Sequence, residues 1–446
     1  MSSPPKVSVF ISNYNYARYL PECLDSILAQ TYQDFEIVIV DDGSTDNSLE
    51  ILMDYKRRYP EKIHHYWHPG HANKGLSVSS NLAISKAQGE YLAWTGSDDM
   101  WYPEKLERQI EQLDSDPRLG MVYSYADFVD GEGRVLPGRA GIDITSDPNP
   151  VGRMLRSCHP PAMTVVIRRQ CLEEVGVFDE TLPTIQDWDL WIRVFSRWKV
   201  GFIDRPLAKY RIHGNNQSKG IDPQVELDTY LTLYHRLEQK RFDIGGVLLE
   251  PRNQAILDLQ FAFHLFPNDK VDEAAKRLHA AFHKDPSLYE DVAFINDWLN
   301  QWKPDFYTPE QTHLGLWVIA HLPPTAAPIF RSRLLELQLQ NPETKAFFVQ
   351  RGIQRGKSQS GPVDMARIFD DCPSELPIPR SWKVDVLKEI YPALLFESYK
   401  AGDLPNTRYY WRKTVQLDRS WLANRGVLSI GMKAHLSGRK RTSVGG

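Results

Sequence analysis

Three apolar runs in the first hundred residues each end in polar or acidic side chains, and this repeated pattern limits the folds open to the chain. The runs cover residues 7–11, 35–40 and 90–95. The groups that follow them are Ser12-Asn13-Tyr14-Asn15, Asp41-Asp42-Gly43-Ser44 and Gly96-Ser97-Asp98-Asp99. Amphipathic segments of helical spacing separate the runs, which is typical of βαβ units around a largely parallel sheet. We therefore predict an α/β fold for the first half.

The same alternation continues to about residue 220. Further strands are predicted at 63–67, 121–129, 163–168 and 200–204, and helices at 19–30, 47–58, 76–87, 187–197 and from 103 onward. A stretch bearing Pro, Gly and Asp, from Gly138 to Gly152, is predicted to be a mobile connection. From about Gln224 onward the strand-like runs stop and helical patterns separated by Pro and Gly follow. We predict a domain over 1–235 and an all-helical domain over 236–446.

Two stretches of the helical half resemble each other, at 268–288 and 402–422. Each is predicted to be a turn, an amphipathic helix and a second turn, similar to one half of a tetratricopeptide unit, although no period of 34 residues recurs. We predict an all-α, weakly tetratricopeptide-like domain. Its expected role is recruitment of a second substrate or homo-oligomerisation, because no clustered acid, His or Gly-rich loop comparable to those of the first half is found there.

Charge and cysteine content exclude several classes of protein. The chain has 53 Lys and Arg against 57 Asp and Glu, a net charge of -4, so no overall basic field attracts nucleic acid and we expect none as a partner. The four cysteines, scattered without a CxxC pair, exclude a disulfide framework and disfavour a zinc cluster. They are Cys23, Cys158, Cys171 and Cys372.

We expect a soluble, cytoplasmic protein. The N-terminus lacks the charged and apolar regions of a secretory signal, and the apolar stretch 316–330 is interrupted by His321 and three prolines and is too short to span a bilayer. The last residues, including Lys433 and 439–441, are basic behind apolar positions. They leave open peripheral contact with anionic lipid at the inner face of the membrane, with a solvated terminus as the alternative.

The polar strand ends predict a ligand site, because ligands of open α/β sheets bind at the carboxyl ends of parallel strands. Taken singly, Asp41-Asp42 could be a loop and helix cap, and Asp98-Asp99 a solvated loop. Adjacent carboxylates at a strand end suit Mg²⁺ or Mn²⁺ completed by substrate phosphates. No Gly-rich turn follows the first run and no Walker motif is present, so we predict that phosphates are held through a metal.

These residues resemble the inverting family-two glycosyltransferases of GT-A fold. The resemblance covers about 1–215, half the chain, and rests on motifs at 7–15, 30–31, 35–44, 73–75, 89–91, 97–99, 177–180, 186–191 and 210–213. It implies a GT-A-like, Rossmann-like, mostly parallel sheet with flanking helices. It also implies metal-assisted transfer of a sugar, with inversion, from a nucleotide diphosphate donor, commonly a UDP-sugar, to a hydroxyl of a glycan, lipid-linked or protein acceptor.

Carried over residue by residue, the resemblance implies a nucleotide-sugar site. Ser12 and Tyr14 would line the nucleoside pocket, and Asp42 would hydrogen-bond the base. Asp98 would contact the ribose side, and Asp99 would ligate Mn²⁺ or Mg²⁺. The first acid of the family's DxD-type motif is replaced here by Ser97.

The same resemblance places the catalytic base at Asp187. Independently, Asp187 lies in the first turn of a predicted amphipathic helix, where an acid can simply cap the helix. Displacement at an anomeric carbon needs a carboxylate that takes the acceptor proton on the face opposite the leaving nucleotide. The family often has Glu before this Asp. Gln186 at that position removes one negative charge, and the base Asp187 is kept.

Three more side chains are candidates, each with a structural alternative. His213 follows a strand-like run and is predicted to be a metal or phosphate partner, unless it is structural. Lys74, next to Gly75, could approach the phosphates or be solvated. Trp101, just after the acid pair, could stack on a sugar ring or belong to the core.

Two alternative functions are considered. A nucleotidyltransferase on a related sheet would need a loop rich in Gly and Lys or Arg after the first strand, and none is visible. A catalytically silent scaffold would show an altered Asp99 or Asp187, and both acids are present.

Overall fold

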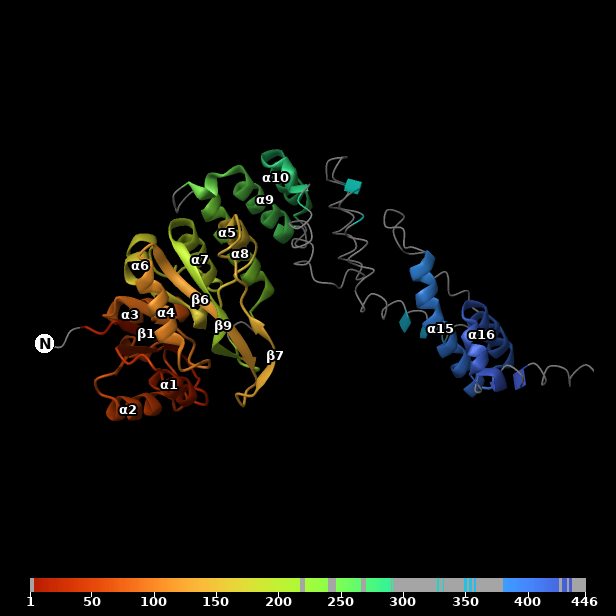
Figure 1. Cartoon of the computed structure of the whole chain (residues 1–446), viewed down its shortest axis with the longest axis horizontal. Coiled ribbons are helices and arrows are strands. Elements are labelled where there is room, and N and C mark those ends of the chain that lie inside the picture. The colour runs from red at the N-terminus through yellow and green to blue at the C-terminus, as the bar shows by residue number, and fades with distance from the viewer. Residues whose placement is uncertain are drawn as a thin grey trace, which may run out of the picture. The chain divides into compact units, whose positions relative to one another are not determined.

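The computed structural model describes residues 4–216, 221–239, 246–265, 270–289, 291 and 380–424, with short pieces between 327 and 357 and at 427–430 and 433–434. The chain divides into two compact units, Met1–Asp285 and Pro286–Gly446. Figure 1 labels many of their helices and strands.

A nine-stranded sheet of described residues forms the centre of the first unit, in the order β3-β2-β1-β4-β8-β6-β9-β5 with β7 beside β6. Strands β1 to β4 pair in parallel, as do β6 and β9, whereas β5, β7 and β8 pair antiparallel. The predicted α/β fold is confirmed, with a sheet that is parallel in its N-terminal half and mixed beyond. The strands are β1 Val7–Asn13, β2 Phe35–Asp41, β3 Ile63–Trp67, β4 Tyr91–Trp94, β5 Met100–Trp101, β6 Leu119–Val129, β7 Val135–Ala140, β8 Val166–Arg168 and β9 Lys199–Arg211.

Helices cover both faces of this sheet. Because successive side chains of a strand point to opposite faces, Val7, Val9 and Ile11 enter one core with helices α1, α2 and α4. On the other face Phe10 packs against Trp94. The helices are α1 Leu20–Leu28, α2 Ser48–Arg58, α3 Leu76–Lys86, α4 Lys105–Ser115, α5 Pro150–Arg156, α6 Arg169–Val175, α7 Gln186–Arg197, α8 Pro223–Glu238, α9 Pro251–Leu265 and α10 Val271–Lys284.

The stretch predicted to be a mobile connection is partly regular structure, so that prediction is wrong in part. Its first residues close β7, where Ala140 pairs with Ala126 of β6. Its last residues open α5, because the Asn149 side chain accepts a hydrogen bond from the Gly152 N–H at 2.9 Å and caps the helix.

Strand β9 is longer than predicted and joins two predicted runs into one. Pro206 lies inside it and pairs with Tyr125 at a point where the register with β6 shifts. Proline cannot donate to a ladder and is tolerated at such irregularities. The strand therefore continues to Arg211, which places its end beside the loop after β4.

Helices α8 to α10 lie in the first unit, although they follow residue 222. Tyr234 of α8 is fully buried and packs edge-on against Phe261 of α9 at 5.3 Å. Helix α9 also packs on α5. The compact unit thus extends to Asp285, about fifty residues past the predicted end of the N-terminal domain at 235; that boundary itself stays a prediction.

The described part of the second unit is helical. Helices α15 (Arg380–Lys400) and α16 (Leu404–Leu417) pack around a cluster that includes Val386, Ile390 and Leu394. A 3-10 turn, Arg419–Ala423, follows α16, in keeping with the helix and turn predicted at 402–422. The tetratricopeptide likeness stays a prediction.

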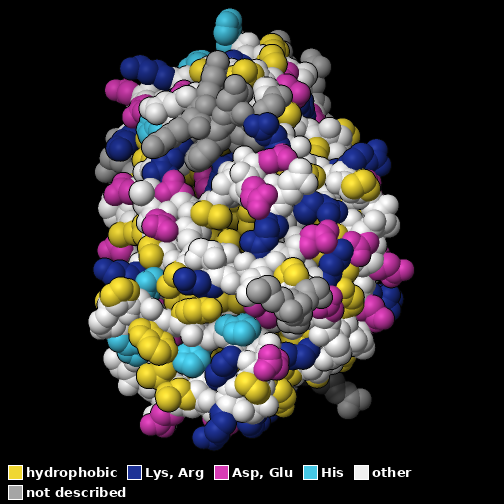
Figure 2. All heavy atoms as spheres, turned by 90° about the vertical axis from the view of Figure 1, so that its left-hand side faces the viewer, with side chains coloured by type: hydrophobic (Ala, Val, Ile, Leu, Met, Phe, Trp, Pro, Cys, Tyr) yellow, Lys and Arg dark blue, Asp and Glu magenta, His cyan; other side chains and the backbone are white. Residues whose placement is uncertain are grey.

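The structure bears on the basic C-terminus, on membrane-spanning helices and on surface charge. Lys433 donates to the Tyr399 hydroxyl at 3.3 Å, whereas residues 439–441 lie outside the described residues. Across the part of the chain that the structure describes, no helix is both long and apolar enough to cross a membrane. Figure 2 shows acidic and basic side chains interspersed over one face, which therefore carries no field of a single sign.

Candidate functional site

The three polar strand ends meet at one edge of the sheet. Strands β2, β1 and β4 are neighbours and run in parallel. Asn13, the last residue of β1, stands directly opposite Asp41, the last residue of β2. The loop that carries Asp98 and Asp99 leaves the same edge from β4. The predicted convergence is confirmed.

Asp41 organises the loop behind this edge. Its carboxylate is fully buried and accepts hydrogen bonds from Asn13 Nδ2 at 2.9 Å, from the Ser44 N–H at 2.9 Å and from the Ser44 hydroxyl at 2.7 Å. These bonds satisfy the buried charge within the turn. Asp41 is therefore an architectural residue.

Asp42 lies just past the end of β2, and its side chain hydrogen-bonds the loop before α3 instead of the turn that Asp41 holds. Its two oxygens accept the backbone N–H groups of Lys74 at 2.7 Å and Gly75 at 2.9 Å. Gly43 permits this approach: its φ is +78°, and a Cβ there would lie 2.7 Å from the His71 carbonyl oxygen. The chain thus brings the predicted Asp42 and Lys74 together through the backbone of Lys74, whose side chain is exposed.

The predicted nucleoside-side residues, Ser12 in β1 and Tyr14 in the loop after it, lie at this edge. The Ser12 hydroxyl hydrogen-bonds the Ser80 hydroxyl of α3 at 2.9 Å and is half-buried. Tyr14 is 38% exposed. Asn15 holds the loop in place, because its Oδ1 accepts the Thr45 N–H at 2.7 Å.

The acid pair after β4 is buried around a glycine. Asp98 is 8% and Asp99 4% exposed. A Cβ added to Gly96 would lie 2.7 Å from Asp98 Oδ1 and 3.2 Å from Asp99 Oδ2, so one oxygen of each carboxylate borders the same small space. Burial raises the pKa of both acids, and the Asp98 charge adds to the rise in the pKa of Asp99.

The end of β9 and the turn that follows it close over this pair. The Arg211 N–H donates to Asp99 Oδ1 at 3.0 Å, and His213 Nε2 lies 3.0 Å from Asp98 Oδ2. The backbone N–H of Asn215 donates to His213 Nδ1 at 3.2 Å. With Nδ1 accepting, the proton of the neutral ring sits on Nε2 and is donated to Asp98. Of the predicted residues, Asp98, Asp99 and His213 are thus brought together, with His213 contacting Asp98.

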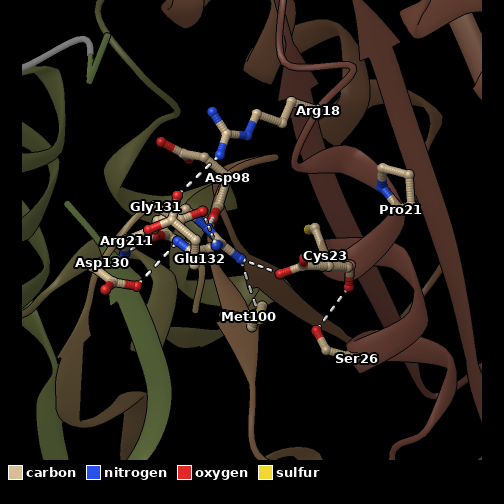
Figure 3. A network of polar contacts seen from close by, with 12 residues as sticks. Arg18, Pro21, Cys23, Ser26, Asp98, Met100, Asp130, Gly131, Glu132 and Arg211 are labelled. Atoms are coloured by element: carbon tan, nitrogen blue, oxygen red, sulfur yellow. Dashed lines mark hydrogen bonds and ion pairs between the residues drawn. The ribbon is translucent and has the colours of Figure 1, made fainter. Parts of the chain in front are cut away.

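Arg211 is a residue of this site that sequence reasoning missed. Its side chain is fully buried and donates to the carbonyl oxygens of Asp98 at 2.8 Å and Gly131 at 3.0 Å, and to Glu22 Oε2 at 2.5 Å. Figure 3 shows it between the loop of Asp98, the turn at Gly131 and helix α1. In the sequence, only its position two residues before His213, within the motif at 210–213, pointed to a role in this site.

The register of a very short strand explains this placement. Strand β5 pairs antiparallel with β9, with Met100 opposite Lys209 and Trp101 opposite Ala208. Extending that register by two residues puts Asp98 opposite Arg211. The pairing of these two strands, which are far apart in the sequence, therefore places the positive charge of Arg211 beside the acidic Asp98 and Asp99.

The acid pair fits a divalent cation that the substrate would complete. Among the described residues, no three His, Cys, Asp or Glu side chains are already gathered as a metal site. Asp98 and Asp99, however, turn one oxygen each toward the space at Gly96, and Mg²⁺ is usually bound through one or two carboxylates plus substrate phosphates. A cation would also favour the ionised form of two carboxylates whose burial opposes ionisation.

Trp101 is a correction to the predicted site. It is 4% exposed and belongs to the core of the first unit. Its Nε1 donates to the Met163 carbonyl oxygen at 3.0 Å, and Lys105 Nζ lies 4.0 Å from the centre of its ring. A ring covered in this way offers no face to a sugar.

Asp187 lies in the first turn of α7, as predicted. Its Oδ1 accepts the Trp188 N–H at 2.9 Å, and the side chain of Trp188 is anchored by a hydrogen bond to the Met154 carbonyl oxygen. Burial raises the pKa of Asp187, and no cation of the described residues is among the groups that shift it. Asp187 makes no direct polar contact with Asp98 or Asp99 in the described structure.

The neighbouring acid of α7 has a different environment. Asp189 is 1% exposed and is paired with Arg193, whose Nη2 lies 2.7 Å from Asp189 Oδ2. Arg193 also donates to the carbonyl oxygens of Val175 and Val177. Asp189 is thus engaged in a structural ion pair, which leaves Asp187 as the acid of this turn without a cation partner among the described residues.

Backbone strain gathers at these loops. The non-glycine residues with positive φ in the described chain are Asn15 at 57°, His71 at 55° and Ile185 at 52°. Ile185 directly precedes α7, and a β-branched residue in this region costs about 1 to 3 kcal/mol. Such strain often marks functional sites.

With this sheet order and a buried acid pair at its carboxyl edge, the first unit has a GT-A-like α/β fold, followed by helices. The family model described as "Glycosyl transferase family 2" matches residues 8–169. An uncharacterized glycosyltransferase of Rickettsia prowazekii is 32% identical over 231 residues, covering 50% of this chain and 69% of that protein. The chain belongs to glycosyl transferase family 2.

Other relatives extend the comparison. An uncharacterized glycosyltransferase of Nostoc sp. is 35% identical over 221 residues, which are 47% of this chain and 66% of that protein. The chain spans between about a third and two thirds of the length of the first curated relatives that it matches. Among solved structures, S. aureus TarS 1-349 in complex with UDP has a TM-score of 0.45 at 17% identity, covering 80% of this chain and 94% of that one. At that distance the likeness says nothing about ligand or activity.

Proposed function

We propose that this chain transfers a sugar from a UDP-sugar to an acceptor hydroxyl with inversion, in one displacement assisted by Mn²⁺ or Mg²⁺. The observation that carries the proposal is the buried Asp98–Asp99 pair at the edge shared by β1, β2 and β4. Membership of family 2 supports sugar transfer. Uridine is the common nucleoside of the proteins that the sequence resembles.

The donor side of the proposed site uses the loops after β1 and β2. Ser12 and Tyr14 line the nucleoside pocket, and Tyr14 is exposed enough to contact a base. Asp42 fixes the Lys74-Gly75 backbone and keeps lone pairs to accept an N–H of the base, since each carboxylate oxygen has two. The exposed side chain of Lys74 is then free to turn toward the diphosphate.

Asp98 and Asp99 hold the cation in this proposal. Asp99 is the main ligand, Asp98 faces the ribose and the cation, and His213 acts through its contact with Asp98. When bound, the divalent cation neutralises the charge that develops on the diphosphate leaving group. Direct ligation by His213 through Nε2 would require the ring proton to move to Nδ1, which would then no longer accept the Asn215 N–H.

Asp187 acts as the general base. The acceptor oxygen attacks the anomeric carbon on the face opposite the diphosphate, the bond to the diphosphate breaks, and the acceptor proton passes to the Asp187 carboxylate. A pKa raised by burial brings this carboxylate closer to the basicity that proton transfer at neutral pH needs. A single displacement of this kind requires no enzyme nucleophile.

The acceptor is a hydroxyl of a glycan, a lipid-linked sugar or a protein. In this proposal the helical second unit recruits the acceptor or joins two copies of the chain. We also propose that the protein is cytoplasmic and that its basic C-terminus contacts the inner face of the membrane.

The test is UDP binding by the full chain with and without Mn²⁺, followed by UDP release from a panel of UDP-sugars. Asp99→Ala should weaken Mn²⁺-dependent UDP binding by at least about tenfold, because it removes one of two carboxylates around the cation. The matched control is Asp34→Ala, a change of an exposed aspartate outside the site. Unchanged UDP affinity and unchanged Mn²⁺ dependence in Asp99→Ala would overturn the proposal.

A further inference from the structure

Asn216 hydrogen-bonds the two residues that close over the acid pair, Arg211 and His213, and reaches Asp98 itself. It lies in the turn after β9, is 6% exposed and is therefore withdrawn from solvent. Its Oδ1 accepts the His213 N–H at 2.7 Å, and its Nδ2 donates to the Arg211 carbonyl oxygen at 2.8 Å. The same Nδ2 lies 3.3 Å from Asp98 Oδ2.

These contacts tie the turn to one oxygen of Asp98. Both Asn216 Nδ2 and His213 Nε2 approach Asp98 Oδ2. With Oδ2 held in this way, the other oxygen, Oδ1, is directed to the space at Gly96 that Asp99 Oδ2 also borders. Asn216 therefore acts on the direction of the Asp98 carboxylate and on the direction of the His213 ring together.

We propose that Asn216 is a positioning residue for the cation-binding carboxylates, which directs Asp98 Oδ1 to the space at Gly96 and holds His213 Nε2 on Asp98 Oδ2. The inference rests on the proposed cation-assisted function. Groups that orient metal ligands typically contribute 10- to 100-fold to metal affinity. Asn216 does not itself touch the donor or the reacting atoms.

The adjacent asparagine provides a matched control. Asn215 is exposed, and its contacts here use only the backbone: its N–H donates to His213 Nδ1, and its carbonyl oxygen accepts the Tyr16 hydroxyl at 2.9 Å. Truncating the Asn215 side chain leaves both bonds possible. Truncating Asn216 removes three.

The experiment is a titration of the full chain with Mn²⁺ in the presence of UDP, with free Mn²⁺ read by electron paramagnetic resonance. Asn216→Ala should weaken Mn²⁺ binding by about 10- to 100-fold, and Asn215→Ala should bind like wild type. The melting temperature of each cation-free protein is measured alongside. Asn216→Ser, which keeps one hydroxyl donor, serves as the second variant if the alanine protein does not fold.

A double-mutant cycle separates positioning from a general loss of structure. If Asn216 acts together with His213 on Asp98, the combined variant with His213→Ala should lose less Mn²⁺ affinity than the two single losses multiplied. Independent losses, or wild-type Mn²⁺ affinity in Asn216→Ala while Asp99→Ala is weakened, would overturn this inference and leave the proposed function standing. Absence of Mn²⁺ binding by the wild-type chain would overturn both.

Discussion

The backbone N–H of Arg211 donates a hydrogen bond to Asp99 Oδ1 at 3.0 Å, across 112 residues of sequence. The same arginine donates from its side chain to the Asp98 carbonyl oxygen. One residue at the end of β9 thereby fixes both the side chain of one acid and the backbone of the other. The geometry of the acid pair depends on β9 as much as on β4.

Removing the buried guanidinium should therefore destabilise the fold as well as the site. Arg211→Met leaves the carbonyl oxygens of Asp98 and Gly131 without their donors, and each unsatisfied buried group costs about 1 to 3 kcal/mol. We expect a loss of roughly 2 to 5 kcal/mol in the free energy of unfolding, measured by urea denaturation. Glu22 is 54% exposed in its side chain, so Glu22→Gln should cost less than about 1 kcal/mol. Equal losses in the two variants would mean that the ion pair, and not the carbonyl contacts, dominates.

Asp187→Asn should abolish transfer while sparing binding. The amide keeps an oxygen that can accept the Trp188 N–H but cannot take a proton. A positioned base contributes about 10² to 10⁴ in rate, so kcat should fall by that factor, whereas the melting temperature and the UDP dissociation constant should stay close to wild type. Turnover within a few-fold of wild type would show that Asp187 only caps α7. Because Asp189 is bound to Arg193, it is no ready substitute.

The compact first unit predicts where the chain can be cut. A chain ending at Asp285 keeps α9 and α10 and should melt cooperatively and bind UDP with Mn²⁺. A chain ending at 245 loses α9 and exposes Tyr234 and the face of α5. Burial of one apolar side chain stabilises the fold by about 1.5 to 3 kcal/mol. Because several such side chains lose their cover, the melting temperature of this shorter chain should fall by at least about 10 °C. Equal melting temperatures for the two truncated chains would contradict the assignment of α9 to this unit.

Acid should weaken the packing of α8 and α9 through one histidine. His264 stacks on Tyr230 at 4.4 Å, and burial lowers its pKa from 6.5 to about 4. Between these values the unfolded chain binds the proton and the folded chain does not, so the free energy of unfolding falls as pH falls from 6.5 to 4. The loss is at most about 3 kcal/mol. His264→Phe keeps a stacked ring without a titrating group, and its melting temperature should depend less on pH over that range. An identical pH profile for wild type and His264→Phe would assign the acid sensitivity to other groups.

The parts of the site that could be predicted from the sequence are those carried by neighbouring parallel strands. The polar ends at Asn13 and Asp41 were expected to meet because parallel strands present their carboxyl ends at one edge, and they do. The role of Arg211 could not be predicted, since it depends on antiparallel pairing with β5, a strand of two residues. No alternation of apolar and polar residues reveals so short a strand.

The same strand explains why Trp101 was placed wrongly. Its position two residues after Asp99 suggested a ring facing the sugar. Pairing of Trp101 with Ala208 instead turns the indole into the core. The packing of α9 on α5 could not be predicted either, because the helical period of α9 shows that it is a helix and does not show which element it contacts.

The alternation of side chains at the end of β2 restricts how related chains can differ in length. Asp41 and Asp42 point to opposite faces, one into the turn with Ser44 and the other toward the Lys74-Gly75 backbone. One residue inserted or deleted within 35–41 would exchange the two acids and carry apolar side chains from one face to the other. Natural variation in length should therefore begin only after Ser44, in the loop before α2, and a set of homologues in which gaps fall inside β2 would not share this arrangement.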